Sequence, residues 1–224
     1  MTNIFAEILR IVHIVGAATW RRLFVAFLAF VIPLLLFVQL ADEVGEQETL
    51  RYDEQVLLAI YSLSSDTLDR IIGATTDLGY TWWVGLVTIV AVSLCVMSRN
   101  YKNALVVVVG VVGSAIINLL LKLFFQRDRP ELWERLITEN SYSFPSGHVM
   151  ASASLAAVII VILWPTKWRY FALAIGSVYV MYIGFTRMYL GVHYPTDIIA
   201  GWLVATSWVA ITTIIVKKLY RRQT

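Results

Sequence analysis

Six long stretches without Asp, Glu, Lys or Arg dominate the pattern of hydrophobic and polar positions. Each has 17 to 21 residues. As a helix each would measure roughly 26–32 Å, close to the hydrocarbon thickness of a bilayer. Because a helix satisfies its own backbone hydrogen bonds in lipid, the pattern predicts six transmembrane helices. The alternative, buried helices of a soluble protein, would show shorter runs and polar outer faces. The stretches are Leu23–Ala41, Leu78–Ser98, Asn103–Leu121, Val149–Thr166, Tyr170–Thr186 and Ile198–Val216.

Composition supports a membrane protein. Apolar residues make up 59% of the 224 residues and charged residues 15%, against about 45–50% and about 25% in soluble domains. We therefore expect one all-α integral membrane domain over residues 1–224. The single cysteine, Cys95, excludes disulfides within the chain and multi-thiolate metal sites. A net charge of +3 is too small to indicate a nucleic-acid partner.

The distribution of charge predicts the orientation. Residues 1–22, 99–102, 167–169 and 217–224 hold 11 of the 18 basic residues and one of the 15 acids. By the positive-inside rule these segments, and both termini, are expected in the cytoplasm. The segments 42–77, 122–148 and 187–197 are then outer segments.

Short interfacial helices are expected next to the spans. Residues 1–22 have apolar positions at helical spacing and predict a cytoplasmic interfacial helix. In the outer segment 42–77, Val56, Ile60 and Leu63 are spaced for a surface helix. A further short helix is expected after Pro130, from the apolar residues Leu132, Trp133, Leu136 and Ile137.

Unusual polar residues cluster at the outer ends of spans three to six. Cations, histidines and a carboxylate at one membrane level are costly to desolvate and indicate a functional site. Arg129 and Arg187 offer planar forks for phosphate oxygens, and Lys122 adds a point charge. Ser146 and Gly147 lead directly into a helix, whose first N–H groups form an anion site. Gly147 also has no side chain to block close approach.

The two histidines supply groups for breaking a phosphate ester. A neutral His193 can attack phosphorus while Asp197 holds its other ring nitrogen. A protonated His148 can donate a proton to the departing alkoxide.

Each of these residues taken alone has a plainer explanation. Lys122 and Arg187 can extend from span ends towards the interface, and Asp197 can complement a helix dipole. His148, His193 and Asp197 could ligate zinc, but three nearby cations would repel Zn²⁺. The joint occurrence of all these residues favours the phosphate site, with no metal.

Three motifs in order then resemble the signature of the phosphatidic acid phosphatase type-2 superfamily. They are Lys122-x6-Arg129-Pro130, Pro145-Ser146-Gly147-His148 and Arg187-x5-His193-x3-Asp197. The motifs cover roughly residues 80–216. One departure is Thr186, where the family usually has Ser; the hydroxyl is kept, so we expect little loss.

The resemblance implies a role for each motif residue. His193 would form a phosphohistidine, Asp197 would orient it, and His148 would serve as acid and later as base. Lys122, Arg129, Ser146, Gly147 and Arg187 would bind the phosphoryl oxygens. No cofactor is expected, because such members need no metal.

The expected substrate is a membrane lipid phosphate, cleaved at the extracytoplasmic face of the cell membrane. The small architecture resembles bacterial members. We expect phosphatidylglycerophosphate first and undecaprenyl diphosphate as the alternative, because the motifs bind phosphate and not the lipid. A non-catalytic lipid-binding or transport protein on the same fold is the third possibility. The bilayer and the lipid are the expected partners, and the residues indicate no obligate protein partner.

Overall fold

The structure, a computed structural model, describes residues 24–25, 27–133, 137 and 139–221. Its described residues form helices joined by turns and loops, and none of them lies in a β-strand. The predicted interfacial helix at 1–22 lies outside the described residues, as does Leu136. The helices, in chain order, are Phe27–Gly45, α2 (Leu50–Tyr61), α3 (Asp66–Thr75), the 3-10 turn η1 (Thr76–Gly79), α4 (Thr81–Met97), α5 (Tyr101–Phe125), α6 (Gly147–Leu163), α7 (Arg169–Tyr189) and α8 (Pro195–Arg221).

The long helices correspond to the predicted apolar stretches. Four of them in the described chain are long and apolar enough to cross a membrane: Phe27–Gly45, α5, α7 and α8. A fifth candidate is the pair formed by Asp66–Gly79 and α4, which bend by 46° at their junction. The remaining stretch forms α6, an apolar helix of 17 residues. The all-helical membrane class is thus confirmed.

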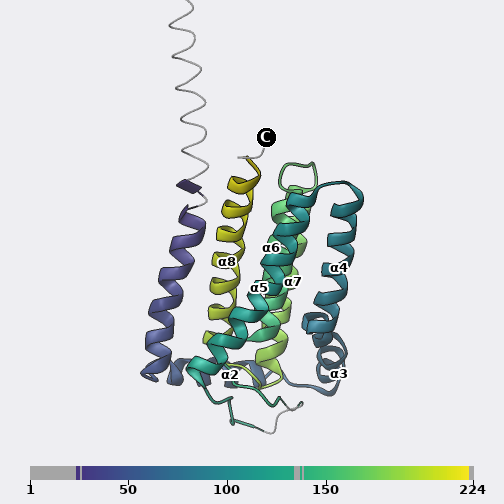
Figure 1. Cartoon of the computed structure of the whole chain (residues 1–224). Coiled ribbons are helices and arrows are strands. Elements are labelled where there is room, and N and C mark those ends of the chain that lie inside the picture. Colours follow the sequence, from purple (N-terminus) through teal and green to yellow (C-terminus); the bar gives the residue numbers. More distant parts are fainter. Residues whose placement is uncertain (1–23, 26, 134–136, 138, 222–224) are drawn as a thin grey trace, which may run out of the picture.

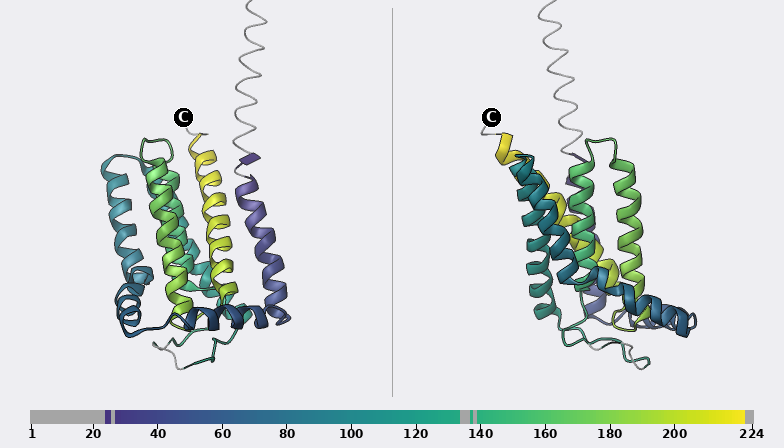
Figure 2. Two further views of the ribbon diagram at one scale, coloured as in Figure 1. Left: turned by 180° about the vertical axis from the view of Figure 1, so that it is seen from behind. Right: turned by 90° about the vertical axis from the view of Figure 1, so that its right-hand side faces the viewer.

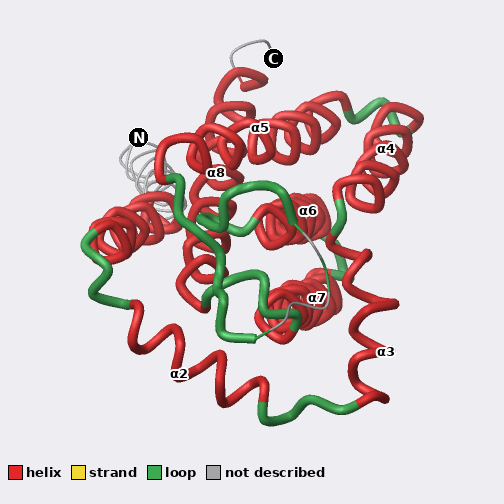
Figure 3. Tube along the Cα trace, turned by 90° about the horizontal axis from the view of Figure 1, so that it is seen from below, coloured by secondary structure: helices red, strands yellow, loops and turns green. Residues whose placement is uncertain are grey.

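Helix α6 occupies the centre of the bundle. It contacts α4, α5, α7 and α8, and the view along the bundle shows it enclosed by them (Figure 3). Its buried face includes Leu155 and Val158, which pack with apolar residues of α5 and α8. The outer surface of the bundle is also apolar, with Ile89, Phe124 and Val178 each more than 60% exposed. An apolar exterior around an apolar core is the pattern of a protein dissolved in lipid.

The three predicted outer segments lie together at one end of the bundle (Figure 1). Helix α2 crosses this end nearly perpendicular to the long helices (Figure 2). The surface helix predicted from Val56 and Ile60 is therefore present as α2. Leu63, however, lies in the turn after it, and the described residues Leu132, Trp133 and Ile137 lie in bends instead of the expected short helix.

Tyrosines of α7 fasten α3 and η1 to the bundle. Tyr179 donates to the carbonyl of Leu78 at 2.7 Å, and the Tyr189 hydroxyl donates to Asp69. Tyr182 shares a short hydrogen bond with Thr75. These contacts fix η1 against the end of α7, where the polar cluster begins.

Candidate active site

The ends of four helices bring the predicted site residues together. Five of the eight line one pocket of about 550 Å³: Lys122, Arg129, Gly147, His148 and His193. The other three lie directly behind them and are fully buried: Ser146, Arg187 and Asp197. Residues up to 75 positions apart in the sequence thus form one site at the end of the bundle that carries α2 and α3.

A tight turn between α7 and α8 places the histidine of the third motif. Gly191 follows α7 with φ +70°, a conformation that favours glycine. Pro195 then starts α8, where its missing N–H is not needed. His193 and Tyr194 lie between the two helices, and Asp197 falls in the first turn of α8. This geometry brings the carboxylate back to the histidine four residues earlier.

The contacts of His193 define which ring nitrogen is free to react. Its Nδ1 lies 3.1 Å from Oδ2 of Asp197, and its Nε2 lies 3.1 Å from Nη1 of Arg129. An arginine can only donate, so Nε2 is the acceptor and Nδ1 carries the proton given to Asp197. The lone pair of a neutral His193 therefore faces the cations of the pocket.

The pKa of His193 favours this neutral form. The side chain is 1% exposed, and burial lowers its pKa well below the ordinary value of 6.5. The positive charges of Arg129, Arg187 and Lys122 lower it further. A nucleophilic imidazole needs an unprotonated nitrogen, so the surroundings keep His193 ready at neutral pH.

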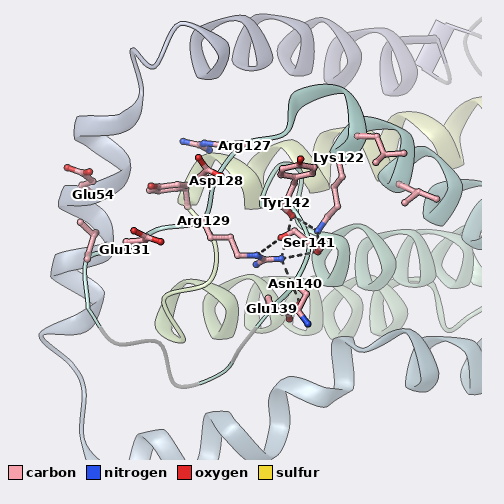
Figure 4. A pocket seen from close by; sticks show the side chains of 14 residues that line it. Glu54, Lys122, Arg127, Asp128, Arg129, Glu131, Glu139, Asn140, Ser141 and Tyr142 are labelled. Atoms are coloured by element: carbon pink, nitrogen blue, oxygen red, sulfur yellow. Dashed lines mark hydrogen bonds and ion pairs between the residues drawn. The ribbon is translucent and has the colours of Figure 1, made fainter.

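Lys122 and Arg129 converge on the same piece of loop. The Nζ of Lys122 donates to Oγ of Ser141 at 2.8 Å and to the carbonyl of Tyr142 at 2.6 Å. Nε of Arg129 donates to the carbonyl of Ser141 at 2.8 Å, and its Nη1 to that of Val192 at 2.7 Å. Both side chains point towards this loop (Figure 4). The loop thus holds two cations beside the reactive nitrogen of the histidine.

Arg187 is held by hydroxyl groups and by a carboxylate. Its Nη1 donates to Oγ1 of Thr76 at 3.0 Å, which lies 3.3 Å from Oγ1 of Thr186. Thr186 in turn donates to the carbonyl of Ile183 at 2.8 Å. The other terminal nitrogen, Nη2, donates to Glu139, whose second oxygen is 3.8 Å from Nη2 of Arg129. One carboxylate therefore links the two guanidinium groups.

The start of α6 forms the opposite wall. Ser146 precedes the helix and donates its N–H to the carbonyl of Asp197 at 3.2 Å. A Cβ on Gly147 would come 3.1 Å from Oδ1 of Asn118, so glycine permits the close approach of α5. The ring of His148 packs edge-on against Tyr80 at 4.6 Å. Because α6 begins at Gly147, the positive end of its helix dipole is directed at the site.

Several buried polar atoms of the site have no hydrogen-bond partner. Within the described residues seven such side-chain atoms occur, and three belong here: Ser146 Oγ, His148 Nε2 and Arg187 Nε. Leaving such an atom unpaired costs about 1–3 kcal/mol. These three unpaired groups lie beside Lys122 and Arg129, and such a set of donors and cations is suited to bind an oxyanion.

The structure adds residues that the motifs did not identify. Arg127 bonds to Asp197 at 2.6 Å and to Asp53 at 2.8 Å, and Thr76, Glu139 and Ser141 hold the cations. One signal in the sequence did mark Asp53. It lies three residues before Val56 and four before Leu57, so an acid occupies the apolar face of a surface helix. Among the described residues, no three His, Cys, Asp or Glu side chains are grouped closely enough to hold a metal ion.

The chain is similar to several known proteins. A family model described as the PAP2 superfamily matches residues 103–221. Phosphatidylglycerophosphatase B of Bacillus subtilis is 28% identical over 75% of this chain and 85% of its own. Undecaprenyl-diphosphatase of Sulfolobus acidocaldarius is 26% identical over 82% of this chain and 88% of its own. The crystal structure of a transmembrane PAP2-type phosphatidylglycerolphosphate phosphatase from Bacillus subtilis shares the fold, with a TM-score of 0.77 at 24% identity, over 88% of this chain and 98% of the other.

Proposed function

The chain belongs to the PAP2 superfamily, a family of membrane lipid phosphatases, and we propose that it hydrolyses phosphatidylglycerophosphate to phosphatidylglycerol and phosphate. The observation that carries this proposal is the position of the His193 ring between Arg129 and Asp197. Its Nε2 faces Arg129, while Asp197 holds the opposite nitrogen. A protein that only bound or transported a lipid phosphate would need cations but no such nucleophile.

The first chemical step forms a phosphohistidine. Nε2 of His193 attacks phosphorus, and the bond from phosphorus to the lipid alcohol oxygen breaks. Burial and the nearby cations lower the pKa of His148 to about 2, and we propose that the anionic phosphate restores its proton when the substrate binds. His148 then gives this proton to the departing oxygen, so the alcohol leaves uncharged. The positive charge that develops on the ring of His193 is stabilised by Asp197.

The second step releases phosphate. His148, now neutral, takes a proton from water, and the resulting hydroxide oxygen attacks phosphorus. The bond between phosphorus and Nε2 breaks, which returns His193 to its neutral form. Arg129, Arg187 and Lys122 stabilise the negative oxygens in both steps. These side chains supply the charge for the whole cycle, and we propose that the enzyme needs no metal.

The shape of the pocket suits a lipid substrate. From His148 the pocket continues between α4 and α5, along Val84, Val111 and Val112. Val84 is buried, whereas Ile89, which also lines the pocket, is 65% exposed on the outside of the bundle. An acyl chain could therefore lie in the bilayer while its phosphate reaches the histidines. This continuity supports a lipid in preference to a soluble phosphate ester.

Undecaprenyl diphosphate remains the second candidate, favoured by the similarity to the Sulfolobus enzyme. The test compares kcat/KM of the purified protein for both lipids, in detergent with excess EDTA. Faster turnover of phosphatidylglycerophosphate supports the first substrate, and the reverse order supports the second. Activity that disappears in EDTA would contradict the metal-free mechanism. Binding of both lipids without hydrolysis would support the alternative of a non-catalytic lipid-binding or transport protein.

For the membrane arrangement we propose six spans, with both termini in the cytoplasm and the site on the extracytoplasmic side. The basic residues of the α4–α5 and α6–α7 connections and of the last turns of α8, which lie at the end of the bundle opposite the site (Figure 1), support this orientation. A single-cysteine variant tests it: in Cys95→Ser carrying Glu46→Cys, an impermeant maleimide should label intact cells from outside. Labelling only after permeabilisation would show that the protein has the opposite orientation.

A further inference from the structure

A buried carboxylate on the surface helix α2 reaches the helix that carries Asp197. Asp53 is 2% exposed. Its Oδ1 accepts the backbone N–H of Thr196 at 3.0 Å, and its Oδ2 accepts the Thr196 hydroxyl at 2.6 Å. Helix α2 contacts both α7 and α8. Asp53 therefore binds the N-terminal turn of α8, one residue before the acid that orients the histidine.

Arg127 joins the two acids. Its Nη2 donates to Oδ2 of Asp53 at 2.8 Å, and its Nη1 donates to Oδ1 of Asp197 at 2.6 Å. The same Nη1 donates to the hydroxyl of Thr196 at 2.8 Å. The guanidinium also lies 4.1 Å from the ring centre of Tyr194. A planar fork in this position fixes the two carboxylates relative to each other.

These contacts determine how Asp197 faces the nucleophile. Its Oδ1 is taken by Arg127, while its Oδ2 accepts from Nδ1 of His193 at 3.1 Å and from the Tyr194 N–H at 2.9 Å. Asp197 is fully buried, so water cannot replace a lost donor. Arg127 is the charged donor to this carboxylate, and without it Asp197 would keep only the neutral donors His193, Tyr194 and Ser143.

We propose that Asp53 and Arg127 are positioning residues for the reaction, acting through Asp197 on the ring of His193. The proposal rests on the proposed phosphatase function, because it concerns the alignment of that nucleophile. Arg127 binds Asp53 and Asp197, whereas the ring of His193 is contacted by Asp197 and Arg129. Removal of Asp53 or Arg127 should therefore affect phosphoryl transfer and leave phosphate binding intact.

The first variant is Asp53→Asn, which removes the charge and keeps a similar shape. Asp66→Asn is the matched control, because Asp66 is an exposed acid of the same outer segment. We expect kcat to fall about 10- to 100-fold, as when an orienting partner of a reactive side chain is removed. KM and the inhibition constant of orthovanadate should stay at the values of the control.

The second variant, Arg127→Lys, keeps the charge but cannot bridge two carboxylates as a fork. Arg51→Lys, an exposed position on α2, is its control. We expect the same loss of kcat with unchanged KM, and a greater loss in Arg127→Met. This variant decides the matter if Asp53→Asn does not fold.

The outcomes separate the two levels of the proposal. Wild-type protein that hydrolyses neither lipid contradicts the proposed function itself. Active wild type with unchanged kcat in Asp53→Asn or Arg127→Lys overturns the positioning role. A parallel loss of orthovanadate binding would also overturn it, since that result would mean general disruption of the site.

Discussion

Glu139 occupies the place where two arginines would receive a phosphate. Its carboxylate accepts from Arg187 and lies 3.8 Å from Nη2 of Arg129. A bound phosphate ester must displace this contact or tolerate a negative charge beside it. The substitution Glu139→Gln removes the charge and keeps an acceptor of similar size.

The structure gives the size of the expected effect. Arg187 keeps its charge, so Glu139→Gln removes the Coulomb attraction of the ion pair and leaves a hydrogen bond with one charged partner. A loss on the order of 1.4 kcal/mol, near the low end of the about 1.5–3 kcal/mol of charged hydrogen bonds, corresponds to about tenfold in affinity. We therefore expect the inhibition constant of orthovanadate, and KM, to fall about tenfold.

The assay is phosphate release by purified protein in detergent at increasing orthovanadate concentration. Glu46→Gln, an exposed acid of the outer segment 42–77, is the matched control and should equal wild type. A higher inhibition constant in Glu139→Gln would refute the reasoning. It would show that Glu139 holds Arg187 in its productive orientation and does not compete with phosphate.

Three further predictions concern the site. Burial lowers the pKa of His193 and the neutral form reacts, so kcat/KM should stay at its neutral-pH value below pH 6.5. Ionisation of the substrate is measured separately by phosphorus NMR. A kcat/KM that falls to half at pH 6.5 would contradict this. Gly147→Ala should lower activity and melting temperature, since its Cβ would press on α5, whereas Gly73→Ala, with open space around it, should not. Arg187→Lys should lower kcat/KM about 10- to 150-fold through loss of a charged hydrogen bond. The control Arg70→Lys should keep the wild-type value. Equal kcat/KM in Arg187→Lys and Arg70→Lys would exclude Arg187 from the site.

Chain-wide patterns predicted the architecture well. Runs without charge predicted the long helices because lipid leaves the backbone few other solutions. The asymmetry of basic residues also grouped the three segments that the structure brings to one end. The short helix after Pro130 was a wrong expectation for Leu132 and Trp133. Trp133 instead stacks on Tyr61 at 4.5 Å, a contact between distant segments that periodicity does not reveal.

The motifs named residues that the structure brings together, for a physical reason. Lys122, Arg129 and the two histidines stand in motifs because the proposed reaction requires those groups at fixed spacing. The residues that hold them in place were not apparent from sequence. Asp53 lies 144 positions from Asp197, and only the folded chain shows that Arg127 connects them. Glu139 likewise has no local pattern, since its importance comes from two arginines on different segments.

The central claim is that His193 carries the phosphoryl group during the reaction. Phosphatidylglycerophosphate labelled in its terminal phosphate should be mixed with the protein and quenched in alkali, where phosphohistidine survives. The account predicts transient label on the peptide that contains His193, and none in His193→Ala. Full turnover by His193→Ala, or label on a different residue, would contradict it.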